Sequence, residues 1–397
     1  MQNLPELTAK DVENKICLAR VDFNSCFENG KIKSDFRIKK TMPTIEWLIK
    51  QNCRIILMTH IEENDGTIPH LDEFFKLWRR NFFDQNFQNN LHFTDNIVGE
   101  KAKEAAKNLR PRHILLLDNL RLDKREIAND EIFSRELASL GEVYINEAFS
   151  VSHRNHASIV GLPKFLPSFA GFNFRAEIEN LSRIFNPEHP FLVFIGGKKV
   201  VTKEKVIETF LKKADAVILS GMMAVEFLAA KGENIGGTPI DKSAIRLIQE
   251  KFLNQNKIVV PDKFIVASSD VRFPMSDIGY RMSENREIKI ETIKDDDVIY
   301  DVAPEFFESI RARIKESELI LWSGPTGFIE AGFAQGTKKL ISLLIESEAK
   351  TIIGGGDTID FIDSLQLTKK FSFVSTGGGA MLEFLADETL PGIEALR

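Results

Sequence analysis

The chain has 397 residues, of which 43% are hydrophobic and 28% charged, and its formal net charge is −6 at pH 7. A single hydrophobic core stops growing at about 250–300 residues, so this length predicts two domains. The negative charge argues against a general nucleic-acid binder, which needs a basic surface. No apolar run is long enough for a membrane helix, so we expect no association with a membrane.

The amino terminus and the cysteines indicate the compartment. Met1–Glu6 has no basic stretch followed by an apolar core, so we expect a cytoplasmic protein without a secretory signal. Cys17, Cys26 and Cys53 have no C-x-x-C spacing. We therefore expect buried free thiols rather than a metal site or a disulfide.

Short runs of β-branched and aliphatic residues recur along the whole chain. Their length and continuous hydrophobicity predict strands buried on both faces, as in parallel sheets covered by helices. The predicted strands are Ile16–Val21, Arg54–Met58, His113–Leu117, Val143–Ile145, Phe191–Ile195, Ala216–Leu219, Lys257–Val260, Leu319–Trp322, Thr351–Ile353 and Phe371–Val374. The sequence therefore predicts an α/β fold.

Amphipathic segments fill the gaps between these strands, with apolar residues at helical spacing. The clearest predicted helices are Met42–Lys50, Val206–Lys213, Ser243–Asn254, Thr337–Ser347 and Gly378–Leu385. A longer pattern, Ala170–Phe185, ends at Asn186–Pro190, where proline prevents the helix from continuing. We expect the boundary between the two halves at this point.

Three glycine-rich turns follow predicted strands in the second half of the chain. They are Gly196–Lys203, Gly354–Thr358 and Ser375–Ala380. Glycine lets backbone N–H groups approach a phosphate, and a helix N-terminus adds partial positive charge. Each turn alone is also typical of a simple tight connection, but together they predict an anion site at the carboxyl edge of one sheet.

Charged side chains within these turns add to the anion site. Lys199 and Lys203 are one helical turn apart, which suits phosphate binding and equally suits a solvated helix face. Asp357 is a candidate partner for Mg²⁺ or for a Mg-nucleotide, and it is also a candidate helix N-cap, a role that can coexist with the first. The sequence contains no G-x-x-x-x-G-K-[ST] loop, which disfavours the common nucleotide-binding folds.

The first half instead places single basic residues near the ends of strands. These residues lie in Arg20–Asn24, at Arg37, His60 and Arg121, and in Ser152–His156. Gathered at one sheet edge, they would bind a small phosphorylated acid, because the planar arginine fork suits phosphate and carboxylate. A surface ion pair is the alternative for each arginine, and core hydrogen bonds are the alternative for His153 and His156.

At these residues the sequence resembles the phosphoglycerate kinase family, in six segments that occur in order. They are RVDFN at Arg20–Asn24, LLLDNLR at Leu115–Arg121, HRNHAS at His153–Ser158, WSGPTGFIE at Trp322–Glu330, GGGDT at Gly354–Thr358 and STGGGA at Ser375–Ala380. The resemblance covers nearly the whole chain.

The resemblance implies two Rossmann-like three-layer αβα domains with parallel sheets. Residues 1–169 would bind 3-phosphoglycerate or 1,3-bisphosphoglycerate, and residues 188–380 would bind Mg-ADP or Mg-ATP. A helix and hinge over 170–187 would join them and close the cleft, which excludes water from the transferable group. Residues 381–397 would return to the first domain. The resemblance also implies a monomer whose partners are small molecules.

The family's functional residues map onto matching positions of this chain. The acid side comprises Asp22, Asn24, Arg37, His60, Arg121 and Arg154. The nucleotide side comprises Gly196, Gly197, Lys199, Lys203, Gly324, Glu330, Gly354, Gly355, Gly356, Asp357, Thr358, Gly377 and Gly378. Arg37, Lys199 and Lys203 are the expected catalytic residues, Glu330 would lie near the ribose, and Asp357 would meet Mg²⁺ through the nucleotide.

Some positions depart from the usual family pattern. Glu62 and Glu63 stand where the family has a basic residue. The remaining departures are Lys198, Thr202 and Ser323 on the nucleotide side, and Glu147 and Ser150 on the acid side. Three hypotheses follow: an active phosphoglycerate kinase of glycolysis and gluconeogenesis, a divergent homologue that binds nucleotide with weak or no activity, and a kinase for another small carboxylate.

Overall fold

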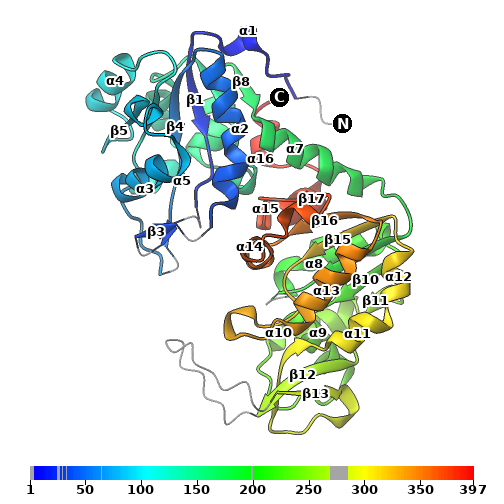
Figure 1. Ribbon diagram of the computed structural model, residues 1–397. Helices are drawn as coiled ribbons and strands as arrows, with labels where there is room; N and C mark the ends of the chain where they lie inside the picture. Colours follow the sequence, from blue (N-terminus) through cyan, green and yellow to red (C-terminus); the bar gives the residue numbers. More distant parts are fainter. Residues whose placement is uncertain are drawn as a thin grey trace. The chain divides into compact units, whose positions relative to one another are not determined.

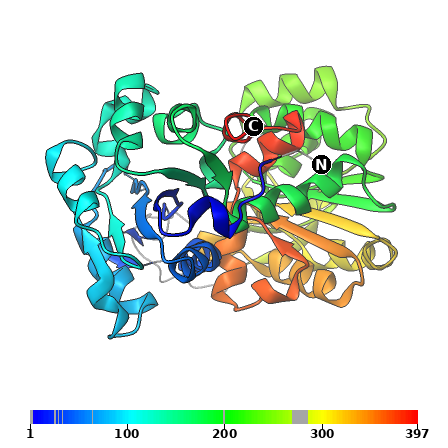
Figure 2. The ribbon, with the colours of Figure 1, turned by 90° about the horizontal axis from the view of Figure 1, so that it is seen from above.

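The computed structural model describes residues 4–24, 27, 28, 30–32, 34–63, 65–197, 200–268 and 285–397 (Figure 1). The chain forms two compact units, Met1–Glu179 with Gly379–Arg397, and Asn180–Gly378. Each unit contains a six-stranded parallel sheet, and helices lie on both sides of its strands (Figure 2). The predicted α/β class with two domains is therefore confirmed. None of the described helices has the length and apolar character needed to cross a membrane.

The sheet of the first unit has the strand order β5-β6-β4-β1-β7-β8. Its strands are β1 (Ile16–Arg20), β4 (Arg54–Met58), β5 (Leu91–Phe93), β6 (Ile114–Leu116), β7 (Val143–Asn146) and β8 (Ser168–Ala170). Leu18 of β1 pairs with Ile56 on one side and Tyr144 on the other. β1 is thus a central strand, which explains its continuous hydrophobic run.

Nine α-helices of the first unit lie in the described residues. They are α1 (Ala9–Val12), α2 (Phe36–Lys50), α3 (Asp72–Phe82), α4 (Glu100–Lys107), α5 (Lys124–Ile127), α6 (Glu131–Ala138), α7 (Phe172–Leu181), α15 (Gly379–Asp387) and α16 (Pro391–Glu394). A short hairpin pairs β2 (Phe27–Glu28) with β3 (Lys31–Ile32).

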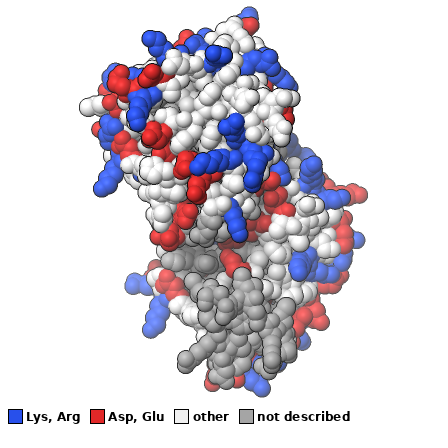
Figure 3. Space-filling model, turned by 60° about the vertical axis from the view of Figure 1, so that its left-hand side comes forward, with Lys and Arg blue, Asp and Glu red and all other residues white. Residues whose placement is uncertain are grey.

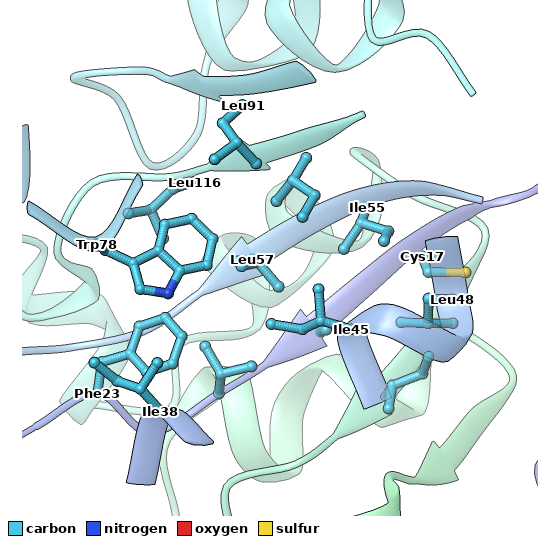
Figure 4. Packing of buried hydrophobic residues seen from close by; sticks show 14 of the residues in the cluster. Cys17, Phe23, Ile38, Ile45, Leu48, Ile55, Leu57, Trp78, Leu91 and Leu116 are labelled. Carbon is cyan, nitrogen blue, oxygen red and sulfur yellow. The ribbon is translucent and has the colours of Figure 1, made fainter. Parts of the chain in front are cut away.

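The core of the first unit packs α2 and α3 against the sheet (Figure 4). Ile45 and Leu48 of α2 and Trp78 of α3 are fully buried. The sequence predicted that α2 begins at Met42, whereas it begins at Phe36 and contains Pro43. Proline removes one helical hydrogen bond, but burial of Phe36 and Ile38 holds the first turn in place. Cys17 and Cys53 are buried free cysteines, and Cys26 lies outside the described residues.

The carboxyl-terminal segment, Gly379–Arg397, packs within the first unit. The rings of Phe384 and Phe149 meet edge to face, with centroids 5.7 Å apart. The backbone N–H of Gly392 donates to the carbonyl oxygen of Ser152 at 2.8 Å. The units divide between Glu179 and Asn180, within α7, and between Gly378 and Gly379.

The sheet of the second unit has the order β11-β10-β9-β15-β16-β17. Its strands are β9 (Phe191–Ile195), β10 (Ala216–Leu219), β11 (Ile258–Val259), β15 (Leu319–Ser323), β16 (Lys350–Gly354) and β17 (Phe373–Val374). All six coincide with predicted strands, within two residues at each end. The helices are α8 (Glu204–Lys213), α9 (Gly221–Lys231), α10 (Lys242–Lys251), α11 (Pro304–Ser309), α12 (Arg311–Lys315), α13 (Gln335–Glu346) and α14 (Gly356–Ser364).

The sequence did not predict a second, antiparallel sheet in this unit. Its order is β13-β12-β14, from β12 (Lys263–Ser268), β13 (Arg286–Lys289) and β14 (Asp297–Val302). β13 reads REIK, with three of its four side chains exposed, so it lacks the buried apolar run that marks the other strands. A short polar edge strand gives no such signal.

Candidate active site

Asp22 organises the first cluster of predicted site residues, just beyond the carboxyl end of β1. The Asp22 carboxylate accepts a hydrogen bond from Arg37 Nη1 at 2.8 Å and from the backbone N–H of Asn24 at 3.0 Å. The Ser150 hydroxyl also donates to Asp22. Arg37 Nη1 further donates to the Asn24 carbonyl oxygen at 3.1 Å. The guanidinium of Arg37 is thus anchored, while 22% of its side chain stays exposed.

Arg20 and His60 form a buried pair behind this cluster. Arg20 Nη2 lies 2.9 Å from His60 Nδ1, and Arg20 Nε donates to the Ser158 hydroxyl at 3.0 Å. A guanidinium can only donate, so Nδ1 accepts and Nε2 carries the proton of the neutral imidazole. Burial, reinforced by the charges of Arg20 and Arg121, holds the pKa of His60 well below its usual range. His60 Nε2 has no hydrogen-bond partner among the described groups, so it is a spare neutral donor.

Arg121 and Arg154 add further positive charge to the same region. Burial is the main cause that lowers the pKa of His156 to about 4, and the charges of Arg121, Arg154 and Arg20 lower it further. Burial and Arg154 also lower the pKa of Arg121. Charges shift one another's pKa values only over short distances. Arg20, Arg121, Arg154 and His156 therefore lie close together, and we call them the cationic cluster. The structure therefore brings together the six residues predicted for the acid side.

Glu62 partly neutralises this cationic cluster. Its carboxylate pairs with Arg121 Nη1 at 3.2 Å, and its backbone N–H donates to Asn24 Oδ1 at 2.9 Å. The Glu62 side chain is 41% exposed, whereas that of Arg121 is 9% exposed. An incoming anion would have to share Arg121 with Glu62. Asn64 lies outside the described residues. Elsewhere, acidic and basic side chains are interspersed on the face shown in Figure 3.

Glycines bring three loops of the second unit into direct contact at the carboxyl edge of its sheet. A Cβ atom added at Gly196 would lie 2.3 Å from the Pro325 carbonyl oxygen. One added at Gly324, whose φ is +95°, would lie 2.5 Å from the Gly196 carbonyl oxygen. A Cβ atom added at Gly355, whose φ is +93°, would lie 3.0 Å from the Gly324 nitrogen. Only glycine allows these backbone approaches, so the loops after β9, β15 and β16 converge on one edge.

Other predicted glycines lie in more open positions. A Cβ atom added at Gly356 or Gly378 would meet nothing within 4 Å. The backbone N–H of Gly377 donates to the Ser375 hydroxyl at 2.9 Å, which shapes the turn after β17. Gly354 ends β16. These turns therefore leave space beside the backbone at the edge where a phosphate was predicted.

Two catalytic lysines were predicted, and the structure describes one of them, Lys203. The other, Lys199, lies outside the described residues, as does Lys198. Lys203 ends a short 3₁₀ turn before α8, and its ammonium group donates to the Gly196 carbonyl oxygen. Burial lowers the pKa of Lys203 to about 8, and the negative charge of Asp357 opposes that shift. The ammonium group is therefore held at the first glycine-rich turn, within electrostatic reach of Asp357.

Asp357 is the second residue of α14, and Gly355 is the N-cap residue of this helix. The predicted role of Asp357 as the N-cap is therefore wrong. No group of three or more acidic, histidine or cysteine side chains that could hold a metal occurs among the described residues. Mg²⁺ bound to a nucleotide needs only one or two carboxylates beside phosphate oxygens. Asp357 fits that requirement.

The second unit also contains a pocket of about 660 Å³, a size typical of small-molecule sites. Gly197, Glu330 and Asp357 are the predicted site residues that line it. Sequence reasoning missed Gly221 and Met222, which also line it. Gly221 directly follows Ser220 and the predicted strand Ala216–Leu219, so a glycine after a strand was the available signal.

Comparison with known proteins settles the family. The model of the family described as phosphoglycerate kinase matches residues 7–388. The chain belongs to the phosphoglycerate kinase family. The phosphoglycerate kinase of Finegoldia magna is 37% identical, over 98% of this chain and 98% of its own. That of Coprothermobacter proteolyticus is 35% identical, over 97% of both chains.

Solved structures of phosphoglycerate kinases agree with this assignment. The enzyme from Pyrococcus horikoshii superimposes with a TM-score of 0.84 at 28% identity, covering 97% of this chain and 96% of its own. The enzyme from Coxiella burnetii gives a TM-score of 0.77 at 29% identity, covering 97% of both chains. The fold and its whole length are thus those of phosphoglycerate kinases, which are phosphotransferases.

Two departures from the usual phosphoglycerate kinase pattern, Ser150 and Glu147, have side-chain partners in this chain. The Ser150 hydroxyl donates to Asp22. Glu147 is buried and accepts from the Thr44 hydroxyl at 2.7 Å, and also from backbone N–H groups at the start of α7. Burial raises the pKa of Glu147 to about 8. These residues support the local structure of the first unit.

Proposed function

We propose that this chain is a phosphoglycerate kinase, which transfers a phosphoryl group reversibly between 1,3-bisphosphoglycerate with ADP and 3-phosphoglycerate with ATP. The match to the family over residues 7–388 carries the proposal. The anchored Arg37 and the desolvated Lys203 support it, because they are the cationic groups that such a transfer requires. The reaction would serve glycolysis and gluconeogenesis in the cytoplasm, in a monomeric enzyme.

Residues 1–169 would bind the phosphorylated acid through the cationic cluster. Arg37, Arg121 and Arg154 would hold its phosphate and carboxylate, since guanidinium groups pair with both in bidentate geometry. Asp22 and Asn24 would orient Arg37 through the hydrogen bonds described above. His60 would support the cluster through its unpartnered Nε2–H.

Residues 188–380 would bind the nucleotide at the glycine-rich edge. The backbone of Gly196, Gly197 and the turns that begin at Gly354 and Gly377 would hold the phosphates, together with Lys199 and Lys203. Glu330 would meet the ribose, and Asp357 and Thr358 would lie at the N-terminus of α14. Mg²⁺, when bound beside Asp357, neutralises part of the phosphate charge.

Catalysis would consist of positioning and charge neutralisation. Phosphoryl transfer passes through a loose, highly charged transition state and needs no covalent nucleophile from the protein. Arg37, Lys199 and Lys203 would neutralise the charge on the transferred group. A hinge over residues 170–187 would close the two domains and exclude water, which otherwise hydrolyses the acyl phosphate.

A coupled assay with 3-phosphoglycerate tests this function, with Mg-ATP and Mg-GTP supplied separately. We expect saturable turnover that disappears when Mg²⁺ is chelated. No turnover with either nucleotide at millimolar substrate would contradict the proposal. Calorimetry then separates the alternatives: nucleotide binding without acid binding indicates a homologue that binds without catalysing. Turnover with another acid from a substrate panel indicates a different carboxylate kinase.

A further inference from the structure

The charge of the nucleotide-side pocket is unusual for a site that would receive an anionic ligand. Every charged residue of the described chain that lines it is acidic: Glu226, Asp241, Asp301, Glu330 and Asp357. Carboxylates repel phosphate, so the part of the ligand that enters this pocket must supply N–H or O–H donors instead. Only a carboxylate whose oxygens retain unused acceptor capacity can accept hydrogen bonds from such donors.

Two of the five carboxylates, Asp301 and Asp241, already accept hydrogen bonds from groups of the protein. Asp301 accepts from the Thr326 hydroxyl at 2.8 Å and from the backbone N–H of Gly336 at 2.9 Å. Asp241 caps α10, where its Oδ1 accepts from the Ser243 backbone N–H at 2.9 Å and from the Ser243 hydroxyl. These contacts stabilise local structure.

Two others have proposed roles of their own, Glu330 beside the ribose and Asp357 beside Mg²⁺. Glu226 remains without a role.

Glu226 is placed to face the pocket. Met222, Val225 and Glu226 lie three and four residues apart on α9, so they share one face of the helix, and all three line the pocket. Glu226 is only 1% exposed. Within the described structure, its carboxylate has a single hydrogen bond, from the Val200 backbone N–H at a long 3.3 Å. Most of its acceptor capacity is therefore unused, which is costly for a buried carboxylate.

The surroundings of Glu226 match a flat, apolar ring. Met222, Val225, Phe264 and Val298 line the same pocket, and such walls suit a purine base. Burial, together with the charge of Asp241, raises the pKa of Glu226 to about 7. A ligand that donates hydrogen bonds would stabilise its charged form.

The two purines differ in what they offer a carboxylate. Guanine presents N1–H and its 2-amino group side by side, and these two donors match the two oxygens of one carboxylate. Adenine presents its 6-amino group beside N1, which is an acceptor and would face a carboxylate oxygen unpaired. A site that hydrogen-bonds both donors of one ligand rejects an analogue that lacks one of them.

We propose that Glu226 reads the base of the nucleotide and gives this kinase a preference for guanosine over adenosine nucleotides. This inference rests on the proposed function, because it assigns the base to the pocket beside the proposed phosphate site. It makes Glu226 a specificity-determining residue.

The test compares GTP with ATP in the wild-type protein, with 3-phosphoglycerate as acceptor. We expect kcat/KM to be about 10-fold or more higher for GTP, the range of one charge-assisted hydrogen bond. Glu226→Gln replaces one acceptor oxygen with a donor group, so it should lower the GTP:ATP ratio by about 10-fold or more. The matched control is Glu233→Gln, an exposed glutamate two residues beyond α9, which should leave the ratio unchanged.

Calorimetry with GDP and ADP provides a readout that does not depend on turnover. Tighter binding of GDP, lost in Glu226→Gln, supports the inference even if the chain transfers no phosphate, which would overturn only the proposed function. A wild-type preference for adenosine nucleotides, or a ratio that Glu226→Gln does not change, overturns the inference. If Glu226→Gln fails to fold, a wild-type affinity for GDP no higher than that for ADP still overturns the inference.

Discussion

The two units prepare for anions in opposite ways. The first unit uses side-chain charge: Arg20, Arg37 and Arg121 are buried or partly buried, and carboxylates or a histidine hold them. The second unit uses missing side chains: Gly196 and Gly324 let loops touch where any Cβ atom would collide. The first site should therefore respond to changes of charge, and the second to changes of size.

Lys203 departs from this contrast, because it places a side-chain charge in the glycine-rich site. We expect Lys203→Ala to lower kcat by about 1,000-fold or more, the effect of losing a cation that neutralises the transition state. Nucleotide affinity should stay largely intact by calorimetry, because Lys199 and the backbone of the glycine-rich turns would still hold the phosphates. Since the pKa of Lys203 is about 8, its charged form is lost as pH rises through that value, and kcat/KM should fall there.

Lys203→Arg separates charge from geometry. Arginine stays protonated, so this variant should lose the decline in kcat/KM above pH 8 even if its rate is lower. An unchanged rate constant in Lys203→Ala would remove Lys203 from catalysis.

Gly324→Ala, which adds one methyl group, tests whether the second site depends on glycines that have no side chain. Gly324→Ala would combine a φ of +95° with a Cβ atom 2.5 Å from the Gly196 carbonyl oxygen. We expect it to lower the unfolding free energy by about 2–4 kcal/mol and to weaken nucleotide binding at least about 10-fold. Denaturant unfolding and calorimetry measure both. Gly356→Ala, whose added Cβ atom meets open space, should keep the wild-type stability.

Glu147 gives a pH test of the first unit. Its folded pKa of about 8 lies above the ordinary value of 4.5, so the stability that it contributes is complete below pH 4.5 and is lost as pH rises through 8. Glu147→Gln should remove about 4 kcal/mol of the fall in unfolding free energy between pH 5 and pH 9, because each unit of pKa shift corresponds to about 1.4 kcal/mol. Urea unfolding at the two pH values checks this. An identical fall in both proteins would contradict it.

Glu62→Gln has the smallest expected effect on substrate binding, and it removes a charge with little change of size. Glu62→Gln should free Arg121 and lower the KM for 3-phosphoglycerate by about 2–5-fold, because a partly exposed ion pair is worth less than about 1 kcal/mol. Glu63→Gln is the matched control, since the structure pairs Arg121 with Glu62 and not with Glu63. Equal KM values in the wild type and Glu62→Gln would show that Glu62 does not compete with the acid.

The sequence predicted the two parallel sheets well because their strands are buried on both faces. Phe191–Ile195 and Arg54–Met58 have the predicted bounds, and burial leaves little choice of residue there. The antiparallel sheet was missed because β13 is polar and mostly exposed. β5 (LHF) and β8 (SFA) were missed because each has a single buried residue, so neither has the continuous apolar run that marks the other strands.

The glycine positions of the candidate site could also be predicted, because a close approach of two backbone segments requires glycine, and glycine is visible in the sequence. The partners of its charged residues could not. Glu62 meets Arg121, 59 residues away, and Glu226 meets the Val200 N–H, 26 residues away. Such pairs depend on tertiary packing, so no local pattern records them.

The return of the last residues to the first unit has a consequence for synthesis on the ribosome. Phe384 and Gly392 contact Phe149 and Ser152, but they leave the exit tunnel only after the whole of the second unit. The second unit is continuous in sequence and can complete its core as soon as it emerges. The first unit starts first and finishes last, which reverses the usual order in which domains mature during translation.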